Sequence, residues 1–367
     1  MKISALQMFW MMAIFQYGMT LLLTQSPALA AAKQDAWISM ALAGIAGVCI
    51  TFICGKISLL YSNQTFVEFC QTILGKWLGK LIVISYLIQF IITMGVILRQ
   101  SSEIIHLTLF RKTPLFIIII LMVYLIVYIV YKGGIEGIGR CSEILGPLIF
   151  LVTIVTLLLS FNSIDWNQIL PVYADSGWRQ IVKGSLAPFS FWAEGIYIMM
   201  LTYFNKEPKR GVSYAIRAVG LVSFFITIIT IEVIMVFGPG LSSRMWYPYF
   251  EMIRFISIME FLQNIEIFVL VIWFLSVFIK LSTYLFITSY GIADFLHLKN
   301  QGKVVWITAL VIISISMYFP NIISASIEFP EKIYIPYIVP INMVGIPLIL
   351  LTVGTIRKNR SKRGNGG

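Results

Sequence analysis

The sequence contains few charged residues and few of the side chains that usually bind metals or carry out nucleophilic catalysis. Only 12% of the 367 residues are Asp, Glu, Lys or Arg, whereas 59% are hydrophobic. This composition is typical of polytopic membrane proteins and argues against a soluble globular protein. The two histidines, His106 and His297, are far apart in the chain, and we place them at opposite membrane faces. We therefore expect no metal site, no cofactor and no enzymatic activity.

Cysteine is also scarce. The four cysteines fall within an apolar run or on the predicted inner side of the membrane: Cys49, Cys54, Cys70 and Cys141. Their positions fit neither a disulfide framework nor the ligand spacing of a zinc site.

Acidic residues are outnumbered by basic ones, and the net charge is +11. This excess could indicate binding to nucleic acid, but most Lys and Arg residues fall in segments that face the cytoplasm if the N-terminus is inside. That is the positive-inside pattern, which orients both termini towards the cytoplasm. We therefore expect the basic tail, 357–367, to anchor the topology and contact anionic membrane lipid, and we expect no binding to nucleic acid.

Long apolar runs, in contrast, are abundant. Each is near the roughly 20 residues that a helix needs to cross a membrane, and helices are expected because backbone groups in lipid must be hydrogen-bonded internally. Ten such runs lie at about 6–31, 37–60, 81–107, 114–131, 143–161, 183–204, 211–238, 263–291, 303–320 and 334–356. The sequence thus predicts an all-α polytopic membrane protein that forms a single membrane domain, 1–367, with ten transmembrane helices.

The first run resembles a cleavable signal peptide, because Lys2 precedes it and Ala28-Leu29-Ala30 lies near its end. Polar residues interrupt the run, however, and nine further runs follow. We therefore expect it to be retained as a transmembrane span.

Polar and small residues interrupt the first and the sixth run, which open the two halves of the chain. Paired interruptions in corresponding spans are typical of transporters built from inverted repeats, with a small-molecule site at mid-membrane. We expect a 5+5 repeat at about 6–161 and 183–356. Half-helix ends at such breaks expose backbone N–H and carbonyl groups to a ligand. The predicted walls of this site are Gln16, Tyr17, Gly18, Met19 and Thr20 on one side and Phe189, Ser190, Trp192, Glu194 and Gly195 on the other.

For the first wall, a glycine-centred packing contact between helices is the alternative. Two further polar residues on the third span, Tyr86 and Gln89, could face the same pocket or bond neighbouring helices. An ionisable residue at the bilayer centre costs about 2.5–3.5 kcal/mol on insertion scales, so Glu194, Glu232 and Lys280 are each expected to have a partner.

Three connecting segments have recognisable patterns. Helical spacing of Phe66, Phe69 and Ile73 predicts a short helix at the inner membrane interface. Four glycines in 133–139 predict a segment that can act as a hinge. The outer segment 240–263 is rich in aromatic residues, and we expect it to form either a gating loop over the site, through Trp246, Tyr247 and Phe250, or an interfacial helix with no gating role.

Several of these segments resemble one known family. The runs 65–69 and 74–80, the segment 134–140 with Glu143, Tyr247-Pro248 with Arg254, and 260–266 leading into Trp273 are similar to the spore germination permeases. These are the B subunits of nutrient germinant receptors, a branch of the amino acid–polyamine–organocation superfamily.

The resemblance implies the LeuT-like fold of that superfamily and a role in triggering germination. It implies a small nutrient ligand, most simply an amino acid, together with A and C subunits as partners in the inner membrane of the spore. In sodium-coupled members of this architecture the first and eighth spans hold a cation. Lys280, followed by Ser282 and Thr283, could replace that cation by bonding carbonyls at the Gly18 break, or could simply pair with Glu194 or Glu232. A stand-alone proton-coupled amino acid transporter is the alternative function.

Overall fold

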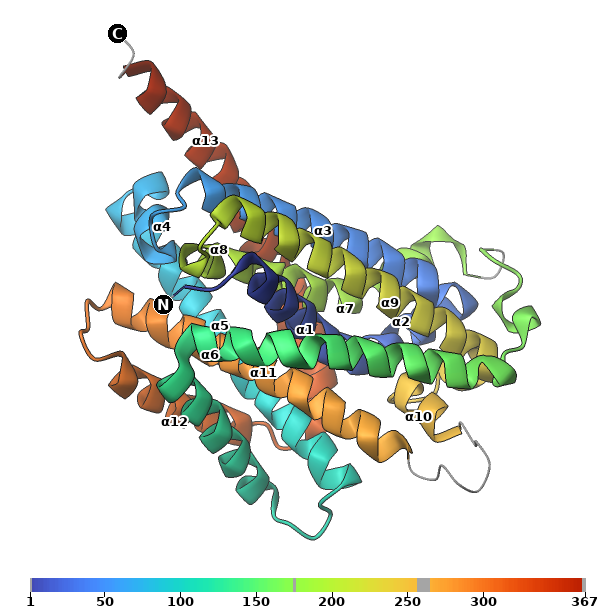
Figure 1. The fold of residues 1–367 in the computed structure, drawn as a ribbon. Coiled ribbons are helices and arrows are strands. Elements are labelled where there is room, and N and C mark those ends of the chain that lie inside the picture. Colours follow the sequence, from blue (N-terminus) through green and yellow to red (C-terminus); the bar gives the residue numbers. More distant parts are fainter. Residues whose placement is uncertain (1, 174–175, 256–264, 365–367) are drawn as a thin grey trace.

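The chain folds as a bundle of helices in the computed structural model, which describes residues 2–173, 176–255 and 265–364, without the side chains of 265 and 361–364 (Figure 1). The helices of the first half are α1 (Ala5–Leu23), α2 (Gln25–Ala32), α3 (Ala36–Leu60), α4 (Phe66–Leu74), α5 (Lys76–Thr108) and α6 (Leu115–Ser160). Those of the second half are α7 (Gly177–Trp192), α8 (Ile198–Leu201), α9 (Pro208–Ser242), α10 (Pro248–Phe255), α11 (Ile265–Phe295), α12 (Gln301–Tyr318) and α13 (Ile346–Gly364).

Short 3₁₀ segments connect several of these helices: η1 (Lys33–Asp35), η2 (Phe161–Ser163), η3 (Trp166–Ile169), η4 (Ala193–Tyr197) and η5 (Thr202–Phe204). Two π-helical segments, η6 (Ser324–Glu328) and η7 (Pro330–Gly345), lead into α13. The short helix predicted in this segment is observed as α4, and its Phe66, Phe69 and Ile73 are buried against the protein.

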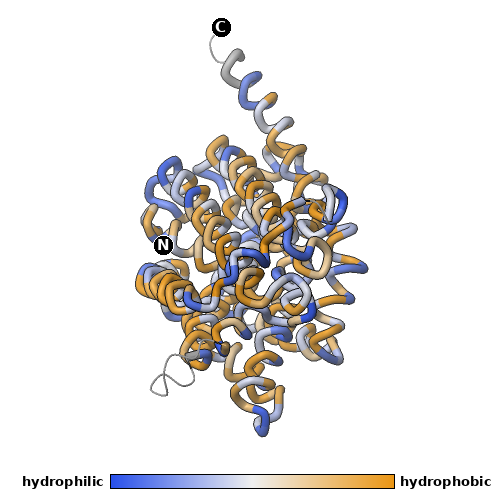
Figure 2. Tube along the Cα trace, turned by 90° about the vertical axis from the view of Figure 1, so that its right-hand side faces the viewer, coloured by the Kyte–Doolittle hydropathy of each residue, from blue (hydrophilic) through white to orange (hydrophobic). Residues whose placement is uncertain are grey.

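Eight helical stretches in the described residues are long and apolar enough to cross a membrane, which makes this a multi-pass membrane protein. Large apolar side chains remain exposed along them, such as Leu121 on α6 and Leu310 on α12. Lipid, unlike water, accommodates such surfaces without cost. Figure 2 shows that apolar residues predominate along the helices of the bundle.

The helix α6 covers two of the expected spans, 114–131 and 143–161, and bends sharply between them at Gly134. This residue has φ 52° and ψ −153°, a conformation that is open to glycine but strained for other residues. The segment 132–140 is therefore helical on both sides of a single break rather than an open loop. Figure 1 shows the two halves of α6 meeting at an angle at one end of the bundle.

The first expected span is interrupted at a different place from the one predicted. Gln16–Thr20 lie within the continuous helix α1, and the chain breaks at Thr24, between α1 and α2. Pro27 cannot donate a backbone hydrogen bond to Leu23, and the Thr24 hydroxyl donates to the carbonyl of Thr20 at 2.6 Å. Both features bend helices. The prediction of a break at Gln16–Thr20 was wrong because the proline four residues after Leu23 decides the position.

The sixth expected span is interrupted at the predicted Glu194 and Gly195, whereas the predicted wall residues Phe189, Ser190 and Trp192 still belong to the helix α7. Helix α7 ends at Trp192, the 3₁₀ segment η4 covers Ala193–Tyr197, and α8 and η5 complete the span. Helix α1 packs in the interior against α6, α9 and α11. The described ends of the chain lie at the end of the bundle that carries α4, and α10 lies at the opposite end (Figure 1).

Candidate functional site

A buried ion pair joins the interrupted span to α11. The ammonium Nζ of Lys280 lies 2.5 Å from Oε2 of Glu194, and the two side chains are only 1% and 3% exposed. Glu194 belongs to η4, where the helical hydrogen-bonding pattern changes. Burying two charges carries a large desolvation cost, which their attraction offsets only when the geometry is favourable. Of the two partners considered for Lys280, Glu194 is the one observed.

Aromatic rings enclose this ion pair. The Lys280 ammonium lies 4.8 Å from the ring centroid of Phe15 on α1, a distance at which cation–π attraction is effective. The rings of Tyr197 and Tyr284 are 4.4 Å apart, and each contacts Phe15. We did not predict these tyrosines from the sequence. The sequence spacing could have indicated them. Tyr284 follows Lys280 by four residues and Tyr197 follows Glu194 by three, so each lies on the same helix face as the charged residue.

A small cavity of about 30 Å³ opens beside Glu194. Helices α5 and α7 and segment η7 contribute its lining, which includes Thr93, Gln100, Ser190, Phe191 and Tyr334. A space of this size holds little more than a water molecule, since one water requires about 10–15 Å³ of it. Any organic ligand at this position therefore requires the surrounding helices to move apart.

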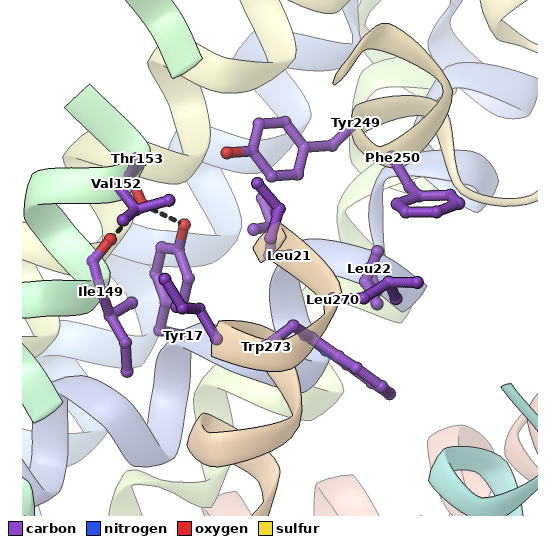
Figure 3. Close-up of a pocket in the computed structure, with 12 residues that line it drawn as sticks. Tyr17, Leu21, Leu22, Ile149, Val152, Thr153, Tyr249, Phe250, Leu270 and Trp273 are labelled. Carbon is purple, nitrogen blue, oxygen red and sulfur yellow. Dashed lines mark hydrogen bonds between the residues drawn. The ribbon is translucent and has the colours of Figure 1, made fainter. Parts of the chain in front are cut away.

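A hydrogen bond joins the two predicted walls of the site, although their residues that line cavities line two different ones. Gln16 on α1 donates from Nε2 to the carbonyl of Trp192 at 3.3 Å, next to the break. Ser190 and Glu194 line the cavity described above. Tyr17 instead lines a separate cavity of about 20 Å³, where its hydroxyl lies 2.5 Å from Oγ1 of Thr153 (Figure 3).

Gly18 is a close packing point between α1 and α11. A Cβ atom at this position would lie 2.1 Å from Oγ of Ser276. The carbonyl of Gly18 accepts a hydrogen bond from Nε1 of Trp273 at 3.0 Å. The structure thus differs from the interpretation in which Lys280 bonds carbonyls freed at Gly18, because α1 is helical there and Lys280 bonds Glu194. Met19 and Thr20 are buried on the same helix.

Glu232 on α9 does not join the Lys280 pair. Its Oε1 accepts a hydrogen bond from Oγ of Ser160, at the end of α6, at 2.5 Å. Near Lys280, Ser282 is buried, and Thr283 donates to the carbonyl of Ile279 in its own helix. Of the predicted ion or coupling residues, Lys280, Ser282 and Thr283 therefore lie together on α11, whereas Glu232 lies on α9 and bonds to α6.

The remaining predicted pocket residues hold helices together in this conformation. Tyr86 donates to the carbonyl of Asn342 at 2.6 Å, and Asn342 donates from its amide to Gln89 at 2.8 Å. Both bonds tie α5 to η7. A Cβ atom on Gly195 would lie 2.1 Å from Oγ1 of Thr51, so the break packs tightly on α3. Phe189 is partly buried and packs on the hydrophobic core.

The described part of the aromatic segment 240–263 contains the helix α10. Trp246 is 49% exposed, whereas Tyr247 and Phe250 are partly buried. The neighbouring Tyr249, which we did not predict, is buried and bonds Thr156 of α6 at 2.7 Å. Burial raises the pKa of the Tyr249 phenol to about 12, so it remains protonated at physiological pH. Glu260, quoted for the family resemblance, lies outside the described residues.

An interrupted helix that carries one member of a buried ion pair, inside a polytopic helical bundle, is typical of membrane transporters. Solved structures agree on the fold. The chain aligns with Mhp1, a nucleobase-cation-symport-1 family transporter, with a TM-score of 0.67 and 12% identity over 86% of this chain and 72% of that one. It aligns with MhsT in complex with L-phenylalanine with a TM-score of 0.63 and 12% identity over 95% and 87% of the two chains. The fold is that of the LeuT-like transporters.

The chain belongs to the family described as "Spore germination protein", whose model matches residues 2–322. It is 30% identical to spore germination protein YndE of Bacillus subtilis over 74% of this chain and 72% of that protein. It is 26% identical to spore germination protein KB of the same organism over 100% and 98% of the two chains. Spore germination protein XB of Bacillus anthracis is 24% identical over 90% and 91%. The family is one of spore germination proteins rather than enzymes.

Proposed function

We propose that this protein is the membrane subunit of a spore germinant receptor, which binds a small nutrient and triggers germination. The observation that carries the proposal is the buried Lys280–Glu194 pair at an interrupted helix, in a chain of the spore germination protein family. A transporter fold has alternative conformations that a ligand can bias, which is what a receptor needs. Net transport of the nutrient need not follow.

In this proposal the nutrient binds between α1 and the α7–η4 break, close to Lys280. The ammonium and the aromatic rings around it suit an amino acid, because they offer a charge for its carboxylate and contacts for an apolar side chain. The solved relative MhsT holds L-phenylalanine. Opening of the cavity beside Glu194 would accompany binding, since the closed cavity has room for little more than one water.

The proposed topology has ten transmembrane helices in an inverted 5+5 arrangement, with both termini in the cytoplasm. The bend of α6 at Gly134 would separate the fourth and fifth spans, and α7 to η5 would form the sixth. The proposed location is the inner membrane of the spore. The proposed partners are the A and C subunits of the receptor, because the relatives are spore germination proteins.

Germination of spores that lack the gene tests the proposal. The mutant spores would be exposed to a panel of amino acids, sugars and nucleosides, and germination would be followed as loss of optical density. We expect loss of the response to one nutrient, or to a small group, and its restoration by the wild-type gene. An unchanged response to every member of the panel would contradict the receptor role for those nutrients.

A proton-coupled amino acid transporter that works alone is the second candidate, favoured by the alignment with solved transporters. Purified protein in liposomes distinguishes the two. Concentrative uptake of a labelled amino acid, driven by a proton gradient and absent from Glu194→Gln liposomes, would favour the transporter. Germination defects without uptake would favour the receptor.

A further inference from the structure

A larger cavity lies away from the Lys280–Glu194 site. Its volume is about 380 Å³, within the range of roughly 300–1,000 Å³ that small-molecule sites occupy. It lies where the bend of α6, the last part of α11 and the start of α12 meet, at the end of the bundle that carries the N-terminus (Figure 1). The residues that matter for its chemistry are Lys132, Ser289, Tyr290, Asn300, Gln301 and Gly302.

The start of α12 gives this cavity a positive character. Asn300 caps the helix by accepting the backbone N–H of Lys303 at 3.2 Å. The N–H groups of Gln301 and Gly302 lie in the first turn and have no partner within their own helix. The N-terminus of a helix also carries a partial positive charge. Lys132, on the α6 side of the same cavity, adds a full positive charge.

A buried hydroxyl gives independent support for a ligand. Ser289 on α11 is 1% exposed, and its Oγ has no hydrogen-bond partner in the described part of the chain. Thr283 on the same helix, by comparison, bonds a carbonyl one turn earlier. A buried hydroxyl without a partner costs free energy, which an acceptor in the cavity would recover. Ser289 lines this cavity.

We propose that this cavity binds a phosphate group. The ammonium, the hydroxyl and the free N–H groups are all donors suited to phosphate oxygens. No Asp or Glu residue is among the described residues that line the cavity. The phosphate can belong to an anionic phospholipid, whose acyl chains would rest on Val130, Phe286 and Val305, or it can be free phosphate. In both cases it would tie the bend of α6 to α12.

Binding to purified full-length protein in detergent tests this proposal. One arm titrates inorganic phosphate and follows the melting temperature. The other titrates dioctanoyl phosphatidylglycerol and counts bound lipid by native mass spectrometry, with dioctanoylglycerol as the ligand that lacks phosphate. We expect saturable binding in at least one arm. Binding of phosphate alone identifies the free ion as the source, and binding of phosphatidylglycerol alone identifies the lipid.

The variants Lys132→Gln and Ser289→Ala connect the binding to this cavity. Loss of a charge-assisted bond should weaken binding about tenfold for Lys132→Gln, and loss of a neutral donor should weaken it about fivefold for Ser289→Ala. Lys112→Gln, a lysine that does not line the cavity, and Ser142→Ala, a buried serine bonded within α6, are the matched controls. The melting temperature of each variant without ligand reports its folding.

Three results would overturn the proposal. The first is the absence of saturable binding in both arms. The second is binding of dioctanoylglycerol as tight as that of phosphatidylglycerol. The third is equal affinity of wild type, Lys132→Gln and Ser289→Ala when all three are folded. The test does not depend on the germinant-receptor role, because it measures binding rather than a response of spores.

Discussion

Lys280 on α11 and Glu194 in η4 form a buried ion pair beside the interrupted helix, with the ring of Phe15 4.8 Å from the ammonium. Because Glu194 belongs to the interruption itself, any rearrangement of η4 must move the pair or break it. Because Phe15 lies on α1, the same rearrangement alters the contact between α1 and the pair. A ligand that enters between these helices would thus act directly on the Lys280–Glu194 pair.

Removal of one charge from this pair should destabilise the protein strongly. We expect Lys280→Met to lower the free energy of unfolding by about 3–5 kcal/mol, because Glu194 is left buried without a partner. The double variant Lys280→Met/Glu194→Gln removes both charges and should recover most of that loss. Melting temperatures of the purified proteins in detergent measure both effects. Equal melting temperatures of the single and double variants would contradict a direct pairing.

The double variant also separates a structural from a functional role of the pair. If the pair takes part in signalling, spores that carry the double variant should assemble the protein at normal level but lose the nutrient response, or respond only when sodium is present. Germination in sodium and sodium-free buffers, with protein level measured by immunoblot, gives the answer. A normal response in both buffers would mean that the pair only holds α11 and η4 together.

We expect substitutions of Gly18 to disturb the packing of α1 against α11 rather than a ligand pocket. A methyl group at this position would meet Oγ of Ser276 at 2.1 Å, and overpacking of this kind costs about 1–3 kcal/mol. We expect Gly18→Ala to lower the melting temperature and the amount of protein in the membrane. Gly18→Ala/Ser276→Gly should restore both. A Gly18→Ala protein with normal melting temperature but a shifted dose–response curve would instead support the pocket interpretation.

Much of the fold could be predicted from the sequence, because apolar runs of about 20 residues have few structural solutions in lipid. The break in the sixth span was predicted correctly at Glu194 and Gly195, whereas the polar Ser190 lies within the helix α7. The position of the break in the first span was predicted wrongly. The polar residues Gln16–Thr20 indicated a break that is not there, whereas Pro27, which has no N–H, ends α1. Within the continuous helix α1, Gln16 and Tyr17 bond to Trp192 and Thr153 of neighbouring elements, so these polar side chains do not require a break in the helix.

The site was harder to predict than the fold. The pairing of Lys280 with Glu194 was one of several possibilities, since sequence alone does not specify which buried charges face each other. Tyr197 and Tyr284 had a detectable signal in their helical spacing from those charges. Tyr334 had none, because it comes from the π-helical segment η7, whose register a helical period of 3.6 residues does not describe.

Tyr249 should contribute more than Trp246 to the position of α10 at its end of the bundle. Its hydroxyl bonds Thr156 at 2.7 Å and joins α10 to α6. Loss of this bond in Tyr249→Phe removes about 0.5–1.5 kcal/mol. If α10 gates the site, the nutrient concentration for half-maximal germination should change up to about tenfold at normal protein level. Trp246→Ala, at an exposed side chain, is the control and should change it little.

The paired variant Trp246→Ala/Tyr247→Ala tests the wider gating loop, because Tyr247 is partly buried and Trp246 is not. A weaker or slower response at normal protein level would support gating. If this variant and Tyr249→Phe reduce only the amount of assembled protein, α10 is a structural helix without a gating role.

Gly134 should be required for the bend of α6. At φ 52° and ψ −153°, an alanine would be strained by about 1–3 kcal/mol. We expect Gly134→Ala to lower the melting temperature of the purified protein. Gly133→Ala is a matched control, because Gly133 lacks a positive φ and a Cβ there would meet only Ile129 at 3.8 Å. It should leave stability nearly unchanged, or raise it slightly through the higher helix propensity of alanine. Equal melting temperatures for the two variants would mean that α6 can bend without a glycine at position 134.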